Sequence, residues 1–302
     1  ENHAMPVFYR NVMYKPGEES EDAACLKLYD GHDWKWFRAG LLHTDVEYLR
    51  RHWSGKKSSA PVLEKRHQKY YLRFSYTEEV TLSKTPVKDQ LICSVDLGIN
   101  TDAVCSIMRS DGTVLDRKFI NFPSEKDRLS HVLGRIRRFQ KEHGSRQIGS
   151  RWAYAKRLNT ELARKTGRSI AEYAHENHAD VIVFEYLEMK GKISGKKRQK
   201  LHLWKKREIQ TMCEHKAHRY GIRVSRVCAW NTSRLAYDGS GPVSRDPKNH
   251  SLCVFQSGKQ YNCDLSASYN IGARYWIREI IKTLPETERS SLEAKVPAVK
   301  RR

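Results

Sequence analysis

Three acidic residues stand where a predicted strand ends or a predicted helix begins. Asp96 follows the apolar run 91–95, and Glu185 follows the apolar run 181–184. Asp264 opens a stretch whose apolar residues have helical spacing. Strand ends in an α/β sheet open onto one crevice, and a helix start can be aimed at the same place. We therefore expect the three carboxylates to converge.

Carboxylates that converge in this way indicate a binding site for divalent cations. Ionised carboxylates that lie close together repel one another unless cations lie between them. Mg²⁺ prefers oxygen ligands and keeps coordination positions for water and phosphate. Two such ions about 3.5–4 Å apart can activate water and stabilise the leaving oxygen of a phosphodiester. We predict that Asp96, Glu185 and Asp264 are both the metal ligands and the catalytic residues, with two Mg²⁺ (or Mn²⁺) ions as cofactors.

Each acid also has a purely structural explanation. Asp96 could cap a turn that Gly98 marks, Glu185 could pair with a nearby lysine, and Asp264 could be a helix N-cap. Taken singly, each of these explanations carries at least as much weight as catalysis. The shared placement of the acids and their basic surroundings favour the metal site.

The charge of the chain indicates its class of partner. The 302 residues include 56 Lys and Arg against 35 Asp and Glu, a formal net charge of +21. Such an excess is typical of proteins that bind nucleic acid, with a merely basic soluble protein as the alternative. Solvated helix faces could also explain the basic stretches. The predicted nucleic-acid-binding residues are Arg135, Arg138, Arg151, Lys156, Arg157, Lys192, Lys196, Lys197, Arg198 and Lys200.

The elements that position the acids follow from the spacing of apolar residues. Short apolar runs predict buried strands, and apolar residues three and four apart predict helices. The first three strands, joined by tight turns, should form an antiparallel meander. Residues 1–88 alternate aromatic and polar residues instead, which predicts short strands of a small barrel. The predicted strands are 91–95, 103–108, 113–122, 181–184 and 222–227, and the predicted helices begin near residues 129, 147, 200 and 265.

Cysteine usage and hydropathy exclude two other classes of protein. The seven cysteines are scattered and none forms a CxxC pair, which argues against a disulfide framework and for a reducing compartment. No stretch approaches the length of an apolar membrane span. We expect no membrane partner and a location in the prokaryotic cytoplasm or nucleoid.

Three segments resemble the split RuvC motifs of TnpB-like transposon nucleases and type V CRISPR effectors. The resemblance covers roughly residues 90–280. The matching segments are 95–100 (VDLGIN), 181–187 (VIVFEYL) and 262–271 (NCDLSASYNI), together with Gln210, His215, Lys216, Ala217, Thr232 and Ser233.

This resemblance implies an α/β fold: an RNase H-like (RuvC) domain with a central mixed sheet and flanking helices, preceded by a small wedge-like β-barrel. It implies guide RNA and target DNA as partners, with base pairing supplying most of the specificity. Arg234 is a candidate for a phosphate or transition-state contact. The implied layout is a wedge-like barrel over 1–88, RuvC parts over 89–230 and 261–285, a degenerate zinc-ribbon-like insert over 231–260, and a disordered basic tail over 286–302.

Two departures from the family pattern carry expectations of their own. Ala236 and Gly239 stand where a first cysteine pair would lie, and Cys253 stands alone near the second, with Gln256 opposite it. We therefore do not expect a four-ligand zinc site, and the insert must be held by other contacts. No helical recognition module precedes the barrel. The chain does not begin with Met, and we expect an upstream module, RNA or a second subunit to fill that role.

Four functions compete for this pattern. The first is a metal-dependent, RNA-guided DNA endonuclease, which the presence of all three acids favours. The second is a guide-RNA-dependent DNA-binding regulator or transposition accessory protein that does not cut. A transposase or integrase usually places Glu on the last helix, where this chain has Asp264. A junction resolvase is normally a much smaller chain without the wedge-like front.

Overall fold

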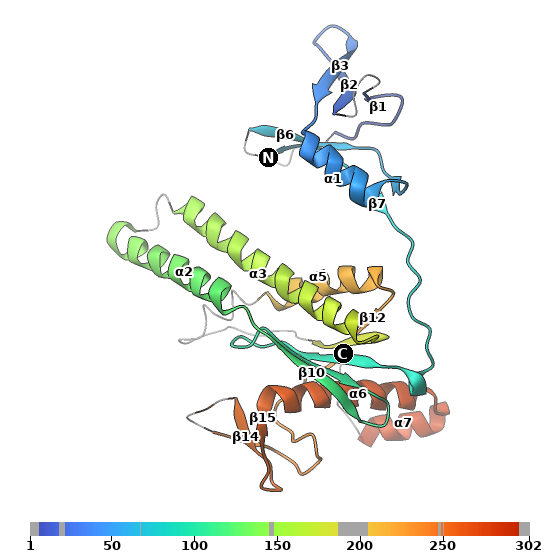
Figure 1. Cartoon of the computed structure of the whole chain (residues 1–302), viewed down its shortest axis with the longest axis vertical. Helices are drawn as coiled ribbons and strands as arrows, with labels where there is room; N and C mark the ends of the chain where they lie inside the picture. Colours follow the sequence, from blue (N-terminus) through green and yellow to red (C-terminus); the bar gives the residue numbers. More distant parts are fainter. Residues whose placement is uncertain are drawn as a thin grey trace. The chain divides into compact units, whose positions relative to one another are not determined.

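The computed structural model divides the chain into two compact units, residues 1–79 and 80–302 (Figure 1). Within the described ranges, no helix has the length and apolar character needed to cross a membrane. The structure describes residues 6–17, 22–66, 68–144, 148–186, 205–246, 249 and 251–295, without the side chains of 292–295.

Within its described residues, the N-terminal unit has three small sheets and one helix. Its core gathers Phe8, Tyr14, Ala24 and Leu26. The first sheet is an antiparallel meander, and the other two are two-stranded pairs. The elements are β1 (Tyr14–Pro16), β2 (Ala23–Tyr29), β3 (Trp34–Gly40), α1 (His43–Trp53), β4 (Lys57–Ser58), β5 (Val62–Arg66), β6 (Lys69–Arg73) and β7 (Tyr76–Thr77).

Helix α1 is an element that we did not predict. Val46, Leu49 and Trp53 have helical spacing and are half-buried, but none of its residues is fully buried, so its apolar stripe is short and shallow. Glu47 instead forms ion pairs with Arg50 and Arg51, one turn further along the helix. Pairs at this spacing stabilise a helix on its exposed face.

The boundary between the units falls earlier than the expected end of the barrel at residue 88. The backbone N–H of Ser83 donates to the carbonyl of Gly221 at 2.8 Å. The Ser83 hydroxyl donates to Asp180 at 2.6 Å. These bonds tie the segment after residue 79 to the C-terminal unit.

The C-terminal unit is built on a mixed five-stranded sheet with the order β10-β9-β8-β11-β12. The first three strands along the chain form the expected antiparallel meander, and β11 and β12 run parallel to β8. The strands are β8 (Ile92–Asp96), β9 (Ala103–Met108), β10 (Val114–Ile120), β11 (Val181–Tyr186) and β12 (Arg223–Cys228).

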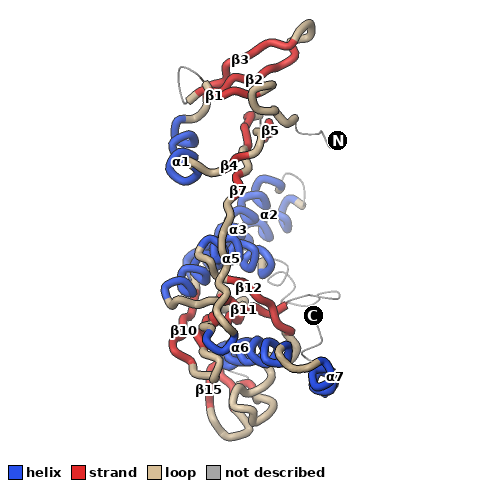
Figure 2. The backbone as a smooth tube through the Cα atoms, turned by 90° about the vertical axis from the view of Figure 1, so that its right-hand side faces the viewer, coloured by secondary structure: helices blue, strands red, loops and turns tan. Residues whose placement is uncertain are grey.

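Helices cover both faces of this sheet (Figures 1 and 2). On one face, Val95 and Phe184 pack in the cluster that contains α3 and α5. On the other face, Val104 and Val183 pack with α6. Helix α2 lies along α3, which covers the first face. The helices are η1 (Val87–Asp89), α2 (Pro123–His143), α3 (Gly149–Glu176), α5 (Lys206–Arg219), α6 (Cys263–Lys282) and α7 (Glu286–Lys295).

The C-terminal tail differs from the expectation of disorder over 286–302. Residues 286–295 form α7, and residues 296–302 lie outside the described residues. The tail is polar and lacks a strong apolar stripe, so its sequence gives little indication of a helix. The expectation of disorder is therefore wrong for its first ten residues.

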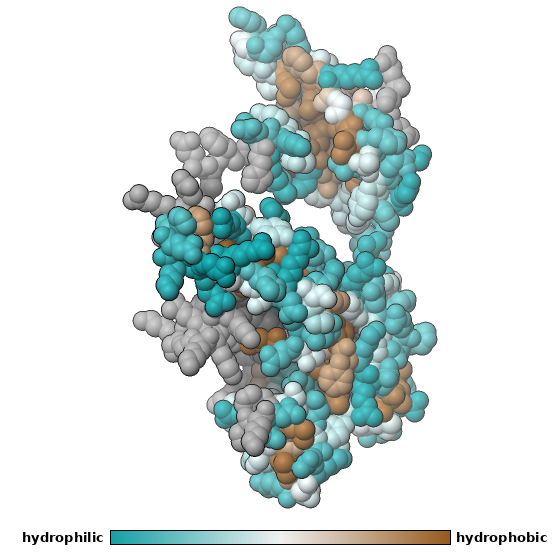
Figure 3. Space-filling model, turned by 60° about the vertical axis from the view of Figure 1, so that its left-hand side comes forward, coloured by the Kyte–Doolittle hydropathy of each residue, from teal (hydrophilic) through white to brown (hydrophobic). Residues whose placement is uncertain are grey.

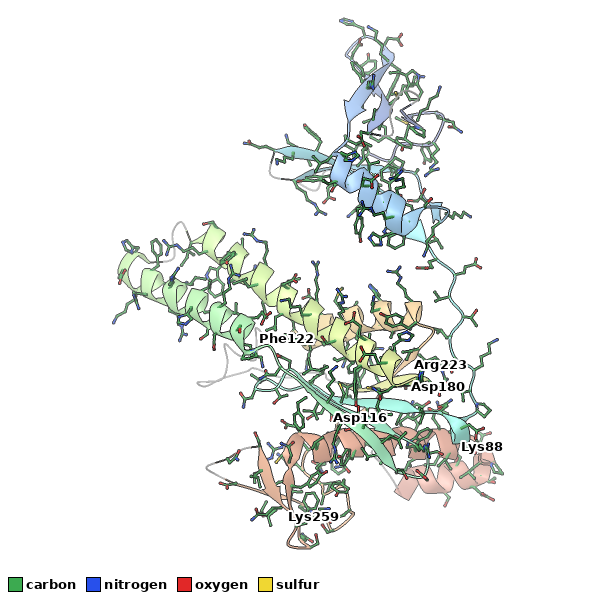
Figure 4. The ribbon with its side chains drawn as sticks, in the orientation of Figure 1. Lys88, Asp116, Phe122, Asp180, Arg223 and Lys259 are labelled. Atoms are coloured by element: carbon green, nitrogen blue, oxygen red, sulfur yellow. The ribbon has the colours of Figure 1, made fainter. Side chains whose placement is uncertain are left out.

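Alternate residues of the strands face the two helical layers. Asp116 of β10, labelled in Figure 4, accepts a hydrogen bond from the hydroxyl of Tyr173 in α3 at 2.9 Å. Asp180 and Arg223, also labelled, precede or begin β11 and β12, so they mark the end of the sheet opposite to Glu185. Side chains beyond that far end are therefore remote from the predicted site.

The insert between β12 and α6 contains a small antiparallel sheet of three strands. Its apolar core consists of Ala236, Cys253, Phe255 and Cys263. Lys259, labelled in Figure 4, donates to the Tyr237 hydroxyl at 2.6 Å on its exposed side. Side-chain packing thus holds this insert. The strands are β13 (Ser244–Arg245), β14 (Leu252–Val254) and β15 (Gln260–Asn262).

Candidate active site

The pairing of two parallel strands places two of the predicted acids side by side. Val95 of β8 pairs with Phe184 of β11, so the next residues, Asp96 and Glu185, are level on neighbouring strands. Strand spacing puts their Cα atoms about 5 Å apart. Because Val95 and Phe184 face α3 and α5, the alternation of the strands turns both acids toward α6.

The third acid lies in the first turn of α6, on that same face. The Asn262 side chain caps the helix by accepting bonds from the backbone N–H groups of Asp264 and Leu265, each at 3.0 Å. The Ser268 hydroxyl lies 2.6 Å from that of Ser106 in β9. Asp264, one turn before Ser268, is thereby directed to the strand ends, and Asn262 rather than Asp264 serves as the N-cap.

The electrostatics of Asp96 report how close the acids lie. Burial raises the pKa of Asp96 well above its usual range, and the negative charges of Glu185 and Asp264 raise it further. The charge of Arg245 opposes this shift. Burial raises the pKa of Asp264 too, again opposed by Arg245. The negative charges of Glu185 and Asp264 therefore both act on Asp96.

Glu185 is held by its own set of partners. Burial raises its pKa, while the hydroxyl of Thr232 and the charges of Arg274 and Lys206 lower it. The Thr232 hydroxyl donates to a carboxylate oxygen of Glu185. The Gln210 amide donates to the Glu185 backbone carbonyl at 2.9 Å. Thr232 and Gln210, both singled out by the family resemblance, thus fix the end of β11.

The three acids lie near one another but do not form a preformed metal-binding site. In the part of the chain that the structure describes, no three His, Cys, Asp or Glu side chains are arranged so that they could hold a metal ion. Glu185 is bonded to Thr232 instead. The set of donors is nevertheless all carboxylate, which suits Mg²⁺ or Mn²⁺ rather than a softer ion.

Removing the hydroxyl that orients Glu185 should slow any reaction that uses this carboxylate. Thr232 is 3% exposed, and valine has nearly the same shape, so Thr232→Val removes the hydrogen bond without opening a cavity. We expect the rate of such a reaction to fall about 10- to 150-fold, the effect of losing a hydrogen bond of roughly 1.5–3 kcal/mol to a charged group. The rate of phosphodiester hydrolysis in magnesium measures this. Thr232→Ser is the matched control and should keep most of the activity, and equal loss in both variants would contradict the assigned role.

Arg245 is a cation at the site that sequence reasoning does not identify. It pairs in register with Cys253 across β13 and β14, and its guanidinium donates to the Ser233 carbonyl at 3.1 Å. Its charge lowers the pKa of Asp96. The predicted candidate, Arg234, is an exposed residue of the turn after Thr232. Only the pairing within the insert brings Arg245 to the acids, and a pattern search has no signal for that pairing.

The predicted basic residues that the structure describes are all exposed on α2 and α3. The Arg151 guanidinium lies 4.1 Å from the centre of the Phe139 ring, and that of Arg157 lies 5.8 Å from the Tyr154 ring. Hydrophilic side chains predominate on the face drawn in Figure 3. The exposed members are Arg135, Arg138, Arg151, Lys156 and Arg157, whereas Lys192, Lys196, Lys197, Arg198 and Lys200 lie outside the described residues.

The chain is similar in sequence to a Cas12f1-like domain and to two TnpB-like proteins. A family model for the Cas12f1-like TNB domain matches residues 207–271. A TnpB-like protein of Aquifex aeolicus (strain VF5) is 26% identical over 247 residues, 74% of this chain and 79% of that protein. A TnpB-like protein of Acidianus two-tailed virus is 28% identical over 204 residues, 61% of this chain and 42% of that protein.

A solved structure has a similar fold. CasPhi-2 (Cas12j), bound to crRNA and phosphorothioate-DNA, superposes with a TM-score of 0.54 at 12% identity. The match covers 86% of this chain and 59% of that chain. This chain therefore spans most of the Aquifex protein but less than two thirds of the viral protein and of CasPhi-2.

Proposed function

We propose that this chain is an RNA-guided DNA endonuclease of the family of TnpB-like proteins and type V CRISPR effectors, which its similarity to a Cas12f1-like domain and to two TnpB-like proteins supports. The observation that carries the proposal is the level placement of Asp96 and Glu185 on parallel strands, facing the start of α6 with Asp264. Three carboxylates at the C-terminal end of neighbouring strands and the start of a helix suit two-metal hydrolysis of phosphodiesters.

The sheet supports the RNase H-like (RuvC) interpretation. An antiparallel meander is followed by two parallel strands, with acids in the last residues of the first and fourth strands and at the start of a later helix. This is the layout that the family resemblance implies. The three small sheets of the N-terminal unit fit a wedge-like domain.

In the proposed mechanism, Asp96, Glu185 and Asp264 would hold two Mg²⁺ or Mn²⁺ ions. Such ions, when bound, activate a water and stabilise the departing oxygen. Thr232 keeps the Glu185 carboxylate oriented, and Arg245 binds the phosphate that is attacked. Charge-assisted bonds from a guanidinium suit a phosphate whose negative charge grows in the transition state.

The proposed partners are guide RNA and target DNA. CasPhi-2, the structural neighbour above, is bound to crRNA and to DNA. The exposed arginines and Lys156 of α2 and α3 supply contacts to phosphates of either strand. An upstream module or a second subunit remains part of the proposal, and zinc does not.

The alternative is a guide-RNA-dependent DNA-binding regulator or transposition accessory protein that does not cleave. One observation favours it: within the described residues, the acids are not gathered as ligands of one ion. Sequencing the nucleic acid that co-purifies with the full chain, followed by cleavage assays on matching DNA in magnesium, separates the two. A discrete structured RNA with cleavage supports the endonuclease, RNA without cleavage supports the alternative, and no RNA contradicts both.

The two arginines near the site should differ in importance. Arg245→Ala removes the cation beside Asp96 and Asp264, and we expect cleavage to fall about 10- to 100-fold, since a charge-assisted bond to the reacting phosphate contributes roughly 1.5–3 kcal/mol. Arg234→Ala, in the same insert, serves as the control and the test of the sequence-based candidate. A larger loss in Arg234→Ala would reverse the two roles.

A further inference from the structure

The edge strand β10 carries an exposed aromatic side chain level with the acids. Phe119 is 48% exposed. It pairs in register with Val104 of β9, which pairs in turn with Asp96 of β8. Glu185 continues this row on β11. Phe119 and the two acids therefore stand on one line across the sheet.

Phe119 also faces the same side of the sheet as the acids. Residues paired directly across a sheet share one face, and Val104 packs in the cluster under α6. Arg117, two residues before Phe119, reaches that side too, where it donates to the hydroxyls of Tyr261 and Tyr269 at 3.1 and 3.3 Å. Tyrosine hydroxyls are neutral, so Arg117 keeps its positive charge beside the exposed ring.

Core packing does not account for this ring. Phe119 is not a member of the buried clusters that the described residues form, whereas its neighbour Val104 is 1% exposed. Two strand spacings place the Cα of Phe119 about 10 Å from that of Asp96. An exposed ring beside a positive charge suits an unpaired base, because every base has a face that stacks on an aromatic side chain.

We infer that Phe119 stacks on an unpaired base of the strand that is cut and so positions the neighbouring phosphodiester at Asp96 and Glu185. Phe119 is then a positioning residue, and the inference rests on the proposed function. Its ligand is single-stranded DNA, bound through a base face and not through a base edge, so the contact is tolerant of sequence.

The test uses the full chain with its co-purified nucleic acid and a short oligodeoxythymidine that carries one 2-aminopurine. Stacking on Phe119 quenches the fluorescence of the 2-aminopurine at one position of the strand. Phe119→Leu keeps an apolar side chain but removes the ring, and Phe119→Trp restores a ring. Leu115→Ala is the matched control, because Leu115 is a 46% exposed apolar residue of the same strand. Quenching is measured in an Asp96→Asn background so that the probe stays intact.

We expect Phe119→Leu to lose the quenching and to raise the KM for cleavage about 5- to 150-fold with little change in kcat, while Phe119→Trp behaves as wild type. Wild-type quenching and KM in Phe119→Leu overturn the inference. So does an equal effect of Leu115→Ala, which would indicate a general disturbance of the strand. Absence of any cleavage by the wild-type chain contradicts the proposed function instead, and the quenching still decides the role of Phe119.

Discussion

Replacing Asp96 with asparagine is expected to lower DNA cleavage by about 10³-fold or more while binding of nucleic acid stays nearly unchanged. Asp96 stands at the centre of the site, since the charges of both Glu185 and Asp264 act on it. Asparagine has the same shape but lacks the charge that a divalent cation needs. The exposed basic residues of α2 and α3, which we propose as the phosphate contacts, are left intact.

The same substitution should stabilise the protein in the absence of metal. The raised pKa of Asp96 means that its ionised form is disfavoured by burial and by two like charges, whereas an asparagine side chain at this position carries no charge to be disfavoured. We therefore expect the unfolding midpoint in EDTA to rise or stay constant in Asp96→Asn. A site that loses function while the fold gains stability is the usual signature of catalytic strain.

Three measurements check this prediction: cleavage rate, binding by gel shift, and thermal unfolding. Asp127→Asn is the control, because Asp127 is an exposed carboxylate on α2 whose loss should leave all three unchanged. Loss of binding in parallel with cleavage, or a drop in the unfolding midpoint, would mean that Asp96 has a structural role.

Strands β8, β9 and β11 of the C-terminal unit were predictable because each buries a run of apolar residues. The runs 91–95 and 181–184 correspond to β8 and β11, and each leads into its acid as expected. Their register was not predictable, since it depends on how two strands far apart in the chain pair with each other. That register is what makes Asp96 and Glu185 level.

Other parts of the site had no local signal at all. Arg245 and Phe119 belong to no recognisable sequence motif. Only the strand pairings β13–β14 and β10–β9 show that they lie near the acids. Thr232 and Gln210 were found through family resemblance, because a side chain that orients a distant carboxylate leaves no periodicity. Helix α1 did have a local signal, since Val46, Leu49 and Trp53 have helical spacing, but this stripe lies among strand-like aromatic runs and is only half-buried.

Adding magnesium should stabilise the wild-type protein, and more so at higher pH. The raised pKa values of Asp96, Glu185 and Asp264 mean that these groups favour folding while protonated. Their contribution is present below the ordinary carboxyl pKa of about 4 and is lost as pH rises through the raised values. Mg²⁺ binds the ionised carboxylates, so its stabilising effect grows over the same window.

At a magnesium concentration about 100-fold above Kd, linkage gives about 2.7 kcal/mol of added stability, which corresponds to about 5–10 °C in the unfolding midpoint of a unit of this size. Thermal unfolding with EDTA and with Mg²⁺, at about pH 5 and about pH 8, measures it. Glu185→Gln should lose most of the shift at pH 8, since one ligand charge is gone. A shift that is the same in Glu185→Gln, or the same at both pH values, would place the magnesium elsewhere on the protein, and the three acids would then have to be explained by packing and hydrogen bonding alone.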